Sequence, residues 1–170
     1  LLRPVNATLY AKFKGGVHMI PKAIRVFPLS KTKEPEEFGT IDKAYNYFCD
    51  VLPSRTPPGR FNIPSEKSHF EKDSLVLFQY AEKKDEEKII AHAMLVSDGC
   101  VLDGELDGYI GYYLFDLNTI NVYNNPISKD EIYNIWEKKL FQAKLKLDPS
   151  KYYEYKRLLK RFGNLASRCN

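Results

Sequence analysis

Two apolar segments separated by six charged residues constrain the fold more than any other feature of the sequence. Residues 74–80 read Ser-Leu-Val-Leu-Phe-Gln-Tyr, and residues 88–96 read Lys-Ile-Ile-Ala-His-Ala-Met-Leu-Val. Between them, residues 82–87 read Glu-Lys-Lys-Asp-Glu-Glu, in which every side chain is charged. This pattern predicts a β-hairpin with two buried strands and a solvated tip. The fold must therefore be built around a sheet.

The chain before this hairpin alternates between regular and irregular segments. Residues 20–29 alternate in polarity and predict a strand. Residues 41–52 place apolar side chains on one helical face, and Thr40 stands where an N-cap is expected. Residues 53–69 predict a loop, because three prolines and a glycine fall within residues 53–59. A loop of this length in a compact domain is often functional.

After the hairpin the pattern predicts two more strands, at residues 109–115 and 119–123, followed by two helices. Ser128 and Glu131 form a capping box at the start of the first of these helices. Asp148, followed by Pro149 at the first helical position, starts the second, and Gly163 is its expected C-cap. Most strands are consecutive along the chain. We therefore expect an α+β fold: a small, curved, mostly antiparallel β-barrel flanked by helices, two of them C-terminal.

The length of 170 residues predicts one domain. We assign residues 20–165 to it, residues 1–19 to an N-terminal extension that is native or added, and residues 166–170 to a tail or linker. The chain does not begin with methionine, which favours a fragment of a larger protein. No apolar run approaches the roughly 18 residues that would span a bilayer, so no membrane partner is expected.

The three cysteines and three histidines are scattered along the chain and form no CxxC pair or metal-ligand spacing. We therefore expect no metal site and no cofactor. The odd number of cysteines argues against an oxidised, secreted scaffold and favours a cytoplasmic protein.

Positive charge is concentrated at the C-terminal end. Residues 137–170 hold ten Lys and Arg and three Asp and Glu, a net +7, so the remainder of this +4 chain carries a net −3. Four of these cations, Lys156, Arg157, Lys160 and Arg161, lie within two turns of the last predicted helix. A cationic helix face is the electrostatic footprint of a nucleic-acid partner.

The hairpin also resembles a known family. Phe70-Glu-Lys-Asp-Ser-Leu-Val-Leu-Phe-Gln-Tyr80, followed by Ile89-Ile-Ala-His-Ala-Met-Leu95, resembles the central strand pair of PUA-like domains, and the EVE and YTH branches are the most similar. Residues 108–123, with Pro126 and Trp136, resemble PUA-like modules of prokaryotic restriction endonucleases, a group that includes the N-terminal recognition domains of McrB-type systems. The resemblance covers about residues 20–160.

The resemblance implies a recognition module rather than an enzyme. Its partner would be DNA in preference to RNA, and any NTPase or nuclease would reside in the remainder of a larger restriction protein. EVE and YTH domains hold a modified base in a pocket with aromatic walls and a few polar groups. The corresponding pocket positions here are Ser30, Arg60, Phe61, Asn62, Phe78, Tyr80, His92 and Tyr112.

The tryptophans typical of that pocket have no counterpart here, so Phe61, Tyr80, Tyr112 or Tyr113 would replace them. A flipped base must recover a few kcal/mol of unstacking energy, and aromatic stacking returns about 1–3 kcal/mol per base. The predicted contacts to the nucleic-acid backbone are Lys31, Arg55, Lys156, Arg157, Lys160 and Arg161.

Three alternatives remain open. The first is an RNA-binding module of the same fold, since net charge does not separate RNA from DNA. The second is a Mg²⁺-dependent nuclease that uses Asp73, Glu86 and Lys88. The third is a protein-interaction domain with an exposed aromatic patch, for which binding would be insensitive to salt.

Overall fold

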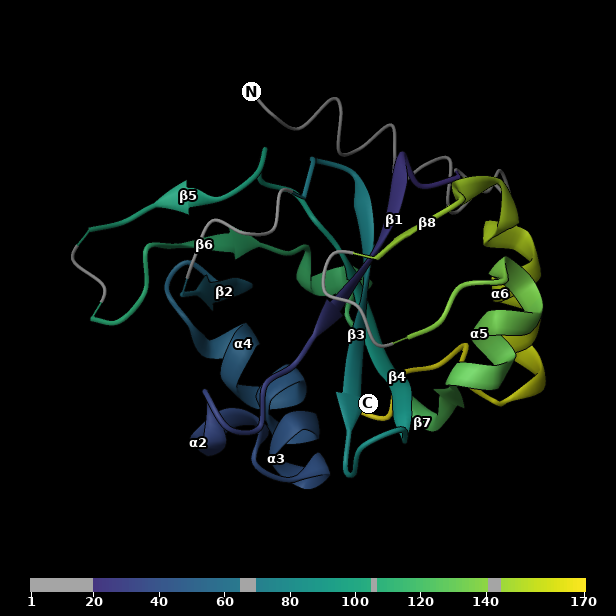
Figure 1. Ribbon diagram of the computed structural model, residues 1–170. Coiled ribbons are helices and arrows are strands. Elements are labelled where there is room, and N and C mark those ends of the chain that lie inside the picture. Colours follow the sequence, from purple (N-terminus) through teal and green to yellow (C-terminus); the bar gives the residue numbers. More distant parts are fainter. Residues whose placement is uncertain (1–19, 65–69, 105–106, 141–144) are drawn as a thin grey trace.

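The computed structural model describes residues 20–64, 70–104, 107–140 and 145–170, so the predicted N-terminal extension lies outside the described residues. It contains a five-stranded sheet of order β7-β4-β3-β1-β8, here called the central sheet, and a three-stranded second sheet of order β2-β6-β5 (Figure 1). The strands are β1 (Ala23–Pro28), β2 (Arg60–Ile63), β3 (Ser74–Ala81), β4 (Glu87–Met94), β5 (Val101–Leu102), β6 (Gly111–Leu114), β7 (Asn121–Ser128) and β8 (Lys146–Leu147). The helices are α2 (Pro35–Phe38), α3 (Ile41–Asn46), α4 (Leu52–Ser54), α5 (Lys129–Trp136) and α6 (Tyr152–Arg161).

The predicted hairpin is confirmed as β3 and β4, which pair antiparallel from Leu75 opposite Met94 to Ala81 opposite Glu87. The neighbour of β3 on its other edge is β1, and this pair is parallel, with Ala23 opposite Ser74. A parallel pair needs a long crossover. The crossover here carries α2, α3, α4 and β2.

The prediction of a β-barrel is wrong. The described strands form two separate sheets, linked by an isolated bridge between Leu95 and Phe115. Closure into a barrel requires every edge strand to find a partner. The central sheet instead ends in β7 on one edge and in the two-residue β8 on the other. The consecutive strands therefore divide between two sheets.

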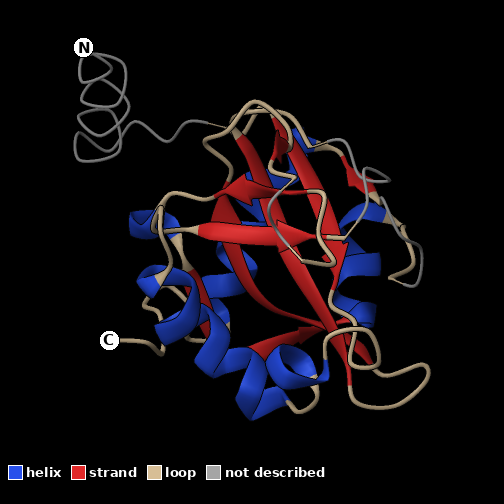
Figure 2. Cartoon of the chain, turned by 90° about the vertical axis from the view of Figure 1, so that its left-hand side faces the viewer, coloured by secondary structure: helices blue, strands red, loops and turns tan. Residues whose placement is uncertain are grey.

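The central sheet buries a different core on each face. Leu75 and Leu77 of β3 contact the core beneath α5 and α6, whereas Val76 and Phe78 belong to the core shared with α2–α4 and the second sheet. Successive residues of a strand point to opposite faces, which explains this alternation. We call these two faces the α6 side and the α3 side. Figure 2 views the molecule from the side of the second sheet.

The core of the α3 side contains a cluster of packed aromatic rings beside its aliphatic side chains. Phe78 lies 4.5 Å from Phe48 and 5.5 Å from Phe61, measured between ring centroids. The predicted helix of residues 41–52 is present as α3, a π-helical turn at Tyr47–Val51 and α4. Its predicted cap is confirmed, since Thr40 Oγ1 accepts a hydrogen bond from the Lys43 backbone N–H at 3.2 Å.

The helices of the α6 side begin where the sequence predicts. Ser128 Oγ accepts a hydrogen bond from the Glu131 backbone N–H at 3.3 Å, which caps α5. The Trp136 indole donates to the Asp148 carbonyl at 2.9 Å and so ties α5 to the start of the last helical segment. Gly163, with a φ of +70°, takes the left-handed conformation expected just after α6.

The segment after α6 lies along the free edge of β7. The side chain of Asn164, which is fully buried, both accepts from the Asn125 backbone N–H at 2.9 Å and donates to the Asn125 carbonyl at 2.6 Å. Farther along, the Arg168 backbone N–H donates to the Val122 carbonyl at 2.9 Å. Within residues 166–170, predicted as a tail or linker, Ser167 and Arg168 are thus hydrogen-bonded to β7, while most side chains of this segment are exposed.

A disulfide between Cys49 and Cys169 fixes the end of this segment to the π-helical turn, 120 residues away in sequence. The odd number of cysteines therefore did not exclude a disulfide, because two of the three pair and Cys100 stays a thiol. In the part of the chain that the structure describes, no helix is both long and apolar enough to cross a membrane.

Candidate nucleic-acid interface

Three of the aromatic residues predicted to line a base pocket lie in the core. Phe61, Phe78 and Tyr80 are each at most 1% exposed and belong to the cluster of the α3 side. Phe61 and Phe78 pack against each other, so their rings have no free face for a base. The predicted pocket therefore lacks these walls.

His92 is separated from the other predicted pocket residues by the central sheet. Its Nδ1 lies 2.7 Å from the Tyr123 hydroxyl, which in turn lies 2.8 Å from the Tyr155 hydroxyl of α6. Burial lowers the pKa of His92 to about 4, and the positive charge of Lys156 adds to the shift. His92 is therefore a neutral member of a hydrogen-bonded chain beneath α6.

The structure does bring together three of the predicted residues on the second sheet. Asn62 of β2 lies opposite Tyr112 of β6, and the Arg60 guanidinium stacks over the Tyr112 ring with its Cζ 4.2 Å from the ring centroid. Arg60 also donates to Asn62 Oδ1 at 3.1 Å and to Asp103 Oδ2 at 2.7 Å. We call Arg60, Asn62, Asp103 and Tyr112 the Arg60 cluster.

The Arg60 cluster is neutralised from within. The side chains of Arg60 and Asp103 are only 15% and 29% exposed, so this ion pair is partly shielded from water. Arg60 also donates to the Thr56 carbonyl at 3.3 Å, which ties the proline-rich segment to the second sheet. Sequence reasoning missed Asp103, because nothing local links it to a residue 43 positions earlier. The cluster holds two sheet strands and a loop together.

The other predicted cations of the α3 side are also engaged. Arg55 forms an ion pair with Glu37 at 2.7 Å and lies over the Tyr47 ring, with 5.2 Å between its Cζ and the ring centroid. Lys31 donates to the Glu82 carbonyl at 2.8 Å. The hydroxyl of Ser30 accepts a hydrogen bond from the Lys33 backbone N–H at 3.1 Å, within a turn.

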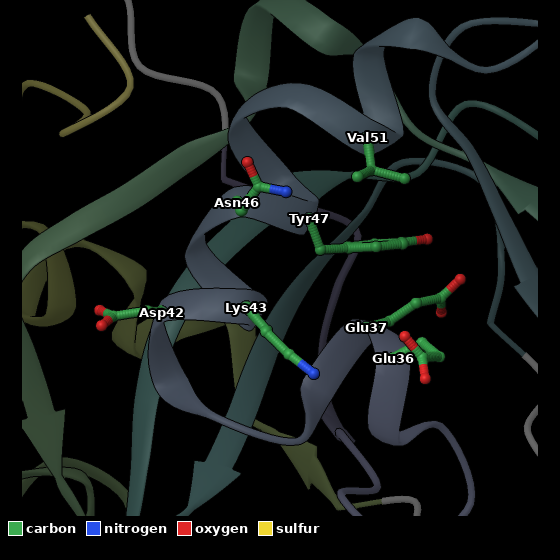
Figure 3. A pocket seen from close by; sticks show the side chains of 7 residues that line it. All are labelled: Glu36, Glu37, Asp42, Lys43, Asn46, Tyr47 and Val51. Atoms are coloured by element: carbon green, nitrogen blue, oxygen red, sulfur yellow. The ribbon is translucent and has the colours of Figure 1, made fainter.

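A pocket of about 300 Å³ opens beside α2 and α3 on this side (Figure 3). Seven residues line it, five of them with charged or amide side chains: Glu36, Glu37, Asp42, Lys43, Asn46, Tyr47 and Val51. Close by, burial raises the pKa of Glu34, and the neighbouring carboxylate of Glu37 raises it further. Three carboxylates and one lysine in the lining disfavour an approaching phosphate.

The exposed face of α6, unlike the α3 side, carries cations that are not paired with acids in the described part of the chain. Arg157, Lys160 and Arg161 are exposed and, at positions i, i+3 and i+4, share one face of the helix, which we call the α6 basic face. The buried residues Tyr155, Leu158 and Leu159 occupy the opposite face. In the described part of the chain, none of the three cations forms an ion pair. Lys156, the fourth cation predicted to contact the backbone from this helix, is partly buried, and burial lowers its pKa.

The predicted pocket and the predicted backbone contacts therefore do not form one site. The Arg60 cluster belongs to the second sheet, and α6 packs against the opposite face of the central sheet (Figure 1). The α6 basic face is the candidate interface, because no ion pair among the described residues neutralises its positive charge.

The nuclease alternative does not fit the geometry. Asp73 precedes β3, whereas Glu86 follows it at the far end of the hairpin. Eight strand residues separate them, a span of about 26 Å, so they cannot share one Mg²⁺. Lys88 lies 3.4 Å from Glu82 in an ion pair. Among the residues with described positions, no group of three or more His, Cys, Asp or Glu side chains is placed to bind a metal.

No family model, no curated protein and no solved structure matches the chain.

Proposed function

We propose that the chain is a non-enzymatic nucleic-acid-binding module and that the α6 basic face contacts the phosphate backbone. The observation that carries this proposal is the exposure of Arg157, Lys160 and Arg161 without acidic partners in the described part of the chain. The sequence resemblance to restriction recognition modules favours DNA over RNA and a larger restriction protein as the parent. The corresponding compartment would be the cytoplasm, where Cys49 and Cys169 would be expected as thiols rather than as the disulfide described above.

The arrangement suits a backbone rather than a base edge. Arginine binds phosphate through two parallel N–H groups, and the positions of the three cations along α6 span about 6 Å. Each neutralised phosphate releases counterions, so affinity falls with salt by a log–log slope of about −0.9 per contact on duplex DNA. Three contacts therefore predict a slope of about −2.7, with little preference for sequence.

A fluorescence-anisotropy titration with a labelled 20-base-pair duplex tests the proposal. The double variant Lys160→Ala/Arg161→Ala should weaken binding at least tenfold and flatten the salt dependence. The control Lys33→Ala/Lys43→Ala also removes two exposed lysine charges, but from the α3 side. Equal losses in both variants would mean that net charge alone drives binding, and no binding by the unaltered protein would refute the function.

A further inference from the structure

The segment after α6 is attached to the protein in two different ways. Asn164 is fully buried, and its side chain bonds to both backbone groups of Asn125. The Asn164 carbonyl also accepts a hydrogen bond from the Asn121 side chain at 2.8 Å. From Leu165 onward the segment lies at the surface, since Leu165 is 56% exposed and most of the side chains that follow it are exposed as well. We call residues 165–170 the C-terminal strap.

The C-terminal strap covers the outer backbone groups of Val122, a residue of β7. The Val122 N–H donates to Ser167 Oγ at 3.0 Å, and the Val122 carbonyl accepts from the Arg168 backbone N–H at 2.9 Å. The Arg168 guanidinium also lies over the Tyr45 ring, with its Cζ 3.9 Å from the ring centroid. The strap therefore spans from the edge of the central sheet to α3.

The Cys49–Cys169 disulfide lies at the far end of the strap, one residue after Arg168. Cys169 is exposed, whereas Cys49 is partly buried. Reduction of a disulfide begins when a thiolate attacks a sulfur that it can reach, so we expect the attack at Cys169. The S–S bond breaks and Cys49 leaves as a thiolate. The second thiol of a dithiol reductant then displaces Cys169, which yields two cysteine thiols and a cyclic disulfide of the reductant.

The two parts of the segment should respond differently to this reaction. Hydrogen bonds at the surface are readily exchanged for hydrogen bonds to water, so they hold a free strap weakly. The covalent link keeps Ser167 and Arg168 at a high local concentration beside Val122, and reduction removes that advantage. The side chain of Asn164 would have to leave the interior before water could replace its partners. Reduction should therefore free the strap and leave Asn164 in place.

We propose that the Cys49–Cys169 disulfide is a redox-sensitive latch. The oxidised form holds the C-terminal strap over Val122, and a dithiol reductant opens the strap about a hinge just after Asn164. Disulfides of cytosolic proteins are commonly transient and redox-sensing, so the disulfide and the thiol form are two states of one protein. The inference does not depend on nucleic-acid binding.

Amide hydrogen exchange, measured by NMR with and without dithiothreitol, tests the latch. The hydrogen bond to Ser167 protects the Val122 N–H in the oxidised protein, and after reduction we expect this amide to exchange about tenfold faster or more. The Asn125 N–H, which is bonded to Asn164, should keep its rate, as should the amides of β3 and β4. Reoxidation with glutathione disulfide should restore the slow rate at Val122.

Two variants complete the test. Cys169→Ser should show the fast rate at Val122 with or without dithiothreitol, whereas Cys100→Ser, which removes the third cysteine, should respond to the reductant like the unaltered protein. A disulfide that dithiothreitol does not reduce in the folded protein, or a Val122 rate that reduction does not change, would overturn the latch. Loss of protection throughout β3 and β4 on reduction would also overturn it, because the disulfide would then be a structural cross-link.

Discussion

On the α3 side of the central sheet, arginines lie beside aromatic rings and acidic partners, whereas on the α6 side the exposed cations of the last helix face water. Arg55 pairs with Glu37 and Arg60 with Asp103, each at 2.7 Å. The acid within α6 does not play this part, since Glu154 lies 3.5 Å from Lys151, at the start of the helix.

The comparison shows why counting charges along a sequence does not locate a binding surface. The acids that neutralise Arg55 and Arg60 are 18 and 43 residues distant, and only the folded chain brings them close. On α6, the cations are crowded at i, i+3 and i+4 on one helix, where local geometry alone keeps them together. A cluster of charges on one helix face can therefore be predicted from the sequence. Ion pairs between residues far apart in the sequence appear only in the folded structure.

The largest expected effect comes from removing the disulfide that joins the segment after α6 to the π-helical turn of the α3 side. Cys49→Ser should lower the free energy of unfolding by up to about 5 kcal/mol, because a loop of 120 residues is no longer closed in the unfolded chain. Urea denaturation measures the loss. Cys100→Ser is the control and should change stability by less than about 1 kcal/mol. If both variants lower the free energy of unfolding by the same small amount, the disulfide does not stabilise the fold.

The hydrogen-bonded chain beneath α6 should give a pH dependence. The unfolded chain binds a proton at His92 near its ordinary pKa of 6.5, and the folded chain near 4. The unfolded state therefore takes up protons first, and stability falls as pH drops from about 6.5 to 4, by about 3 kcal/mol in total. His92→Gln, which stays neutral, should flatten urea-unfolding stability across this window. An unchanged slope would assign the effect to other groups.

The Arg60 cluster should matter for stability and not for binding. Arg60→Ala removes a partly shielded ion pair and its hydrogen bonds, which we expect to lower the free energy of unfolding by about 2 kcal/mol. Its affinity for nucleic acid, measured by anisotropy below the unfolding range, should stay within twofold of the unaltered protein. The reverse outcome, lost binding with full stability, would move the interface to the second sheet.

The smallest expected effect on stability belongs to the α6 basic face. Lys160→Ala should change the free energy of unfolding by less than about 0.5 kcal/mol, because the side chain is exposed. It should nevertheless reduce the salt slope of duplex binding by about 0.9, the contribution of one phosphate. Lys33→Ala serves as the control with an unchanged slope. A slope that stays the same in Lys160→Ala would remove this residue from the interface.

Local patterns predicted the elements well, because the signals are local. The hairpin strands, the Thr40 cap and the Ser128–Glu131 capping box each depend on residues within a few positions of one another. Residues 60–63 were expected to be part of a loop and form β2 instead, because their strand character comes from pairing with β6, about 50 residues later. Pairing of that kind leaves no local signature.

The sheet arrangement and the site were harder to predict for the same reason. β1 pairs parallel with β3, and the crossover that joins them carries β2 on the α3 side of the central sheet. The Arg60 cluster therefore lies on the face opposite to α6. Phe78 and Tyr80 are two residues apart on one strand, which places their side chains on the same face, but alternation does not tell which face meets a ligand. Both point into the core.

The asparagine contacts after α6 have a consequence for how copies of this protein behave toward each other. A long free strand edge is a template on which another chain can add, and native proteins protect such edges. Here the side chain of Asn164 takes the place of a neighbouring strand's backbone at Asn125, and Arg168 does so at Val122. We therefore expect residues 164–168 to protect this edge from pairing with another chain, and their removal would expose the backbone groups of β7 at Val122 and Asn125.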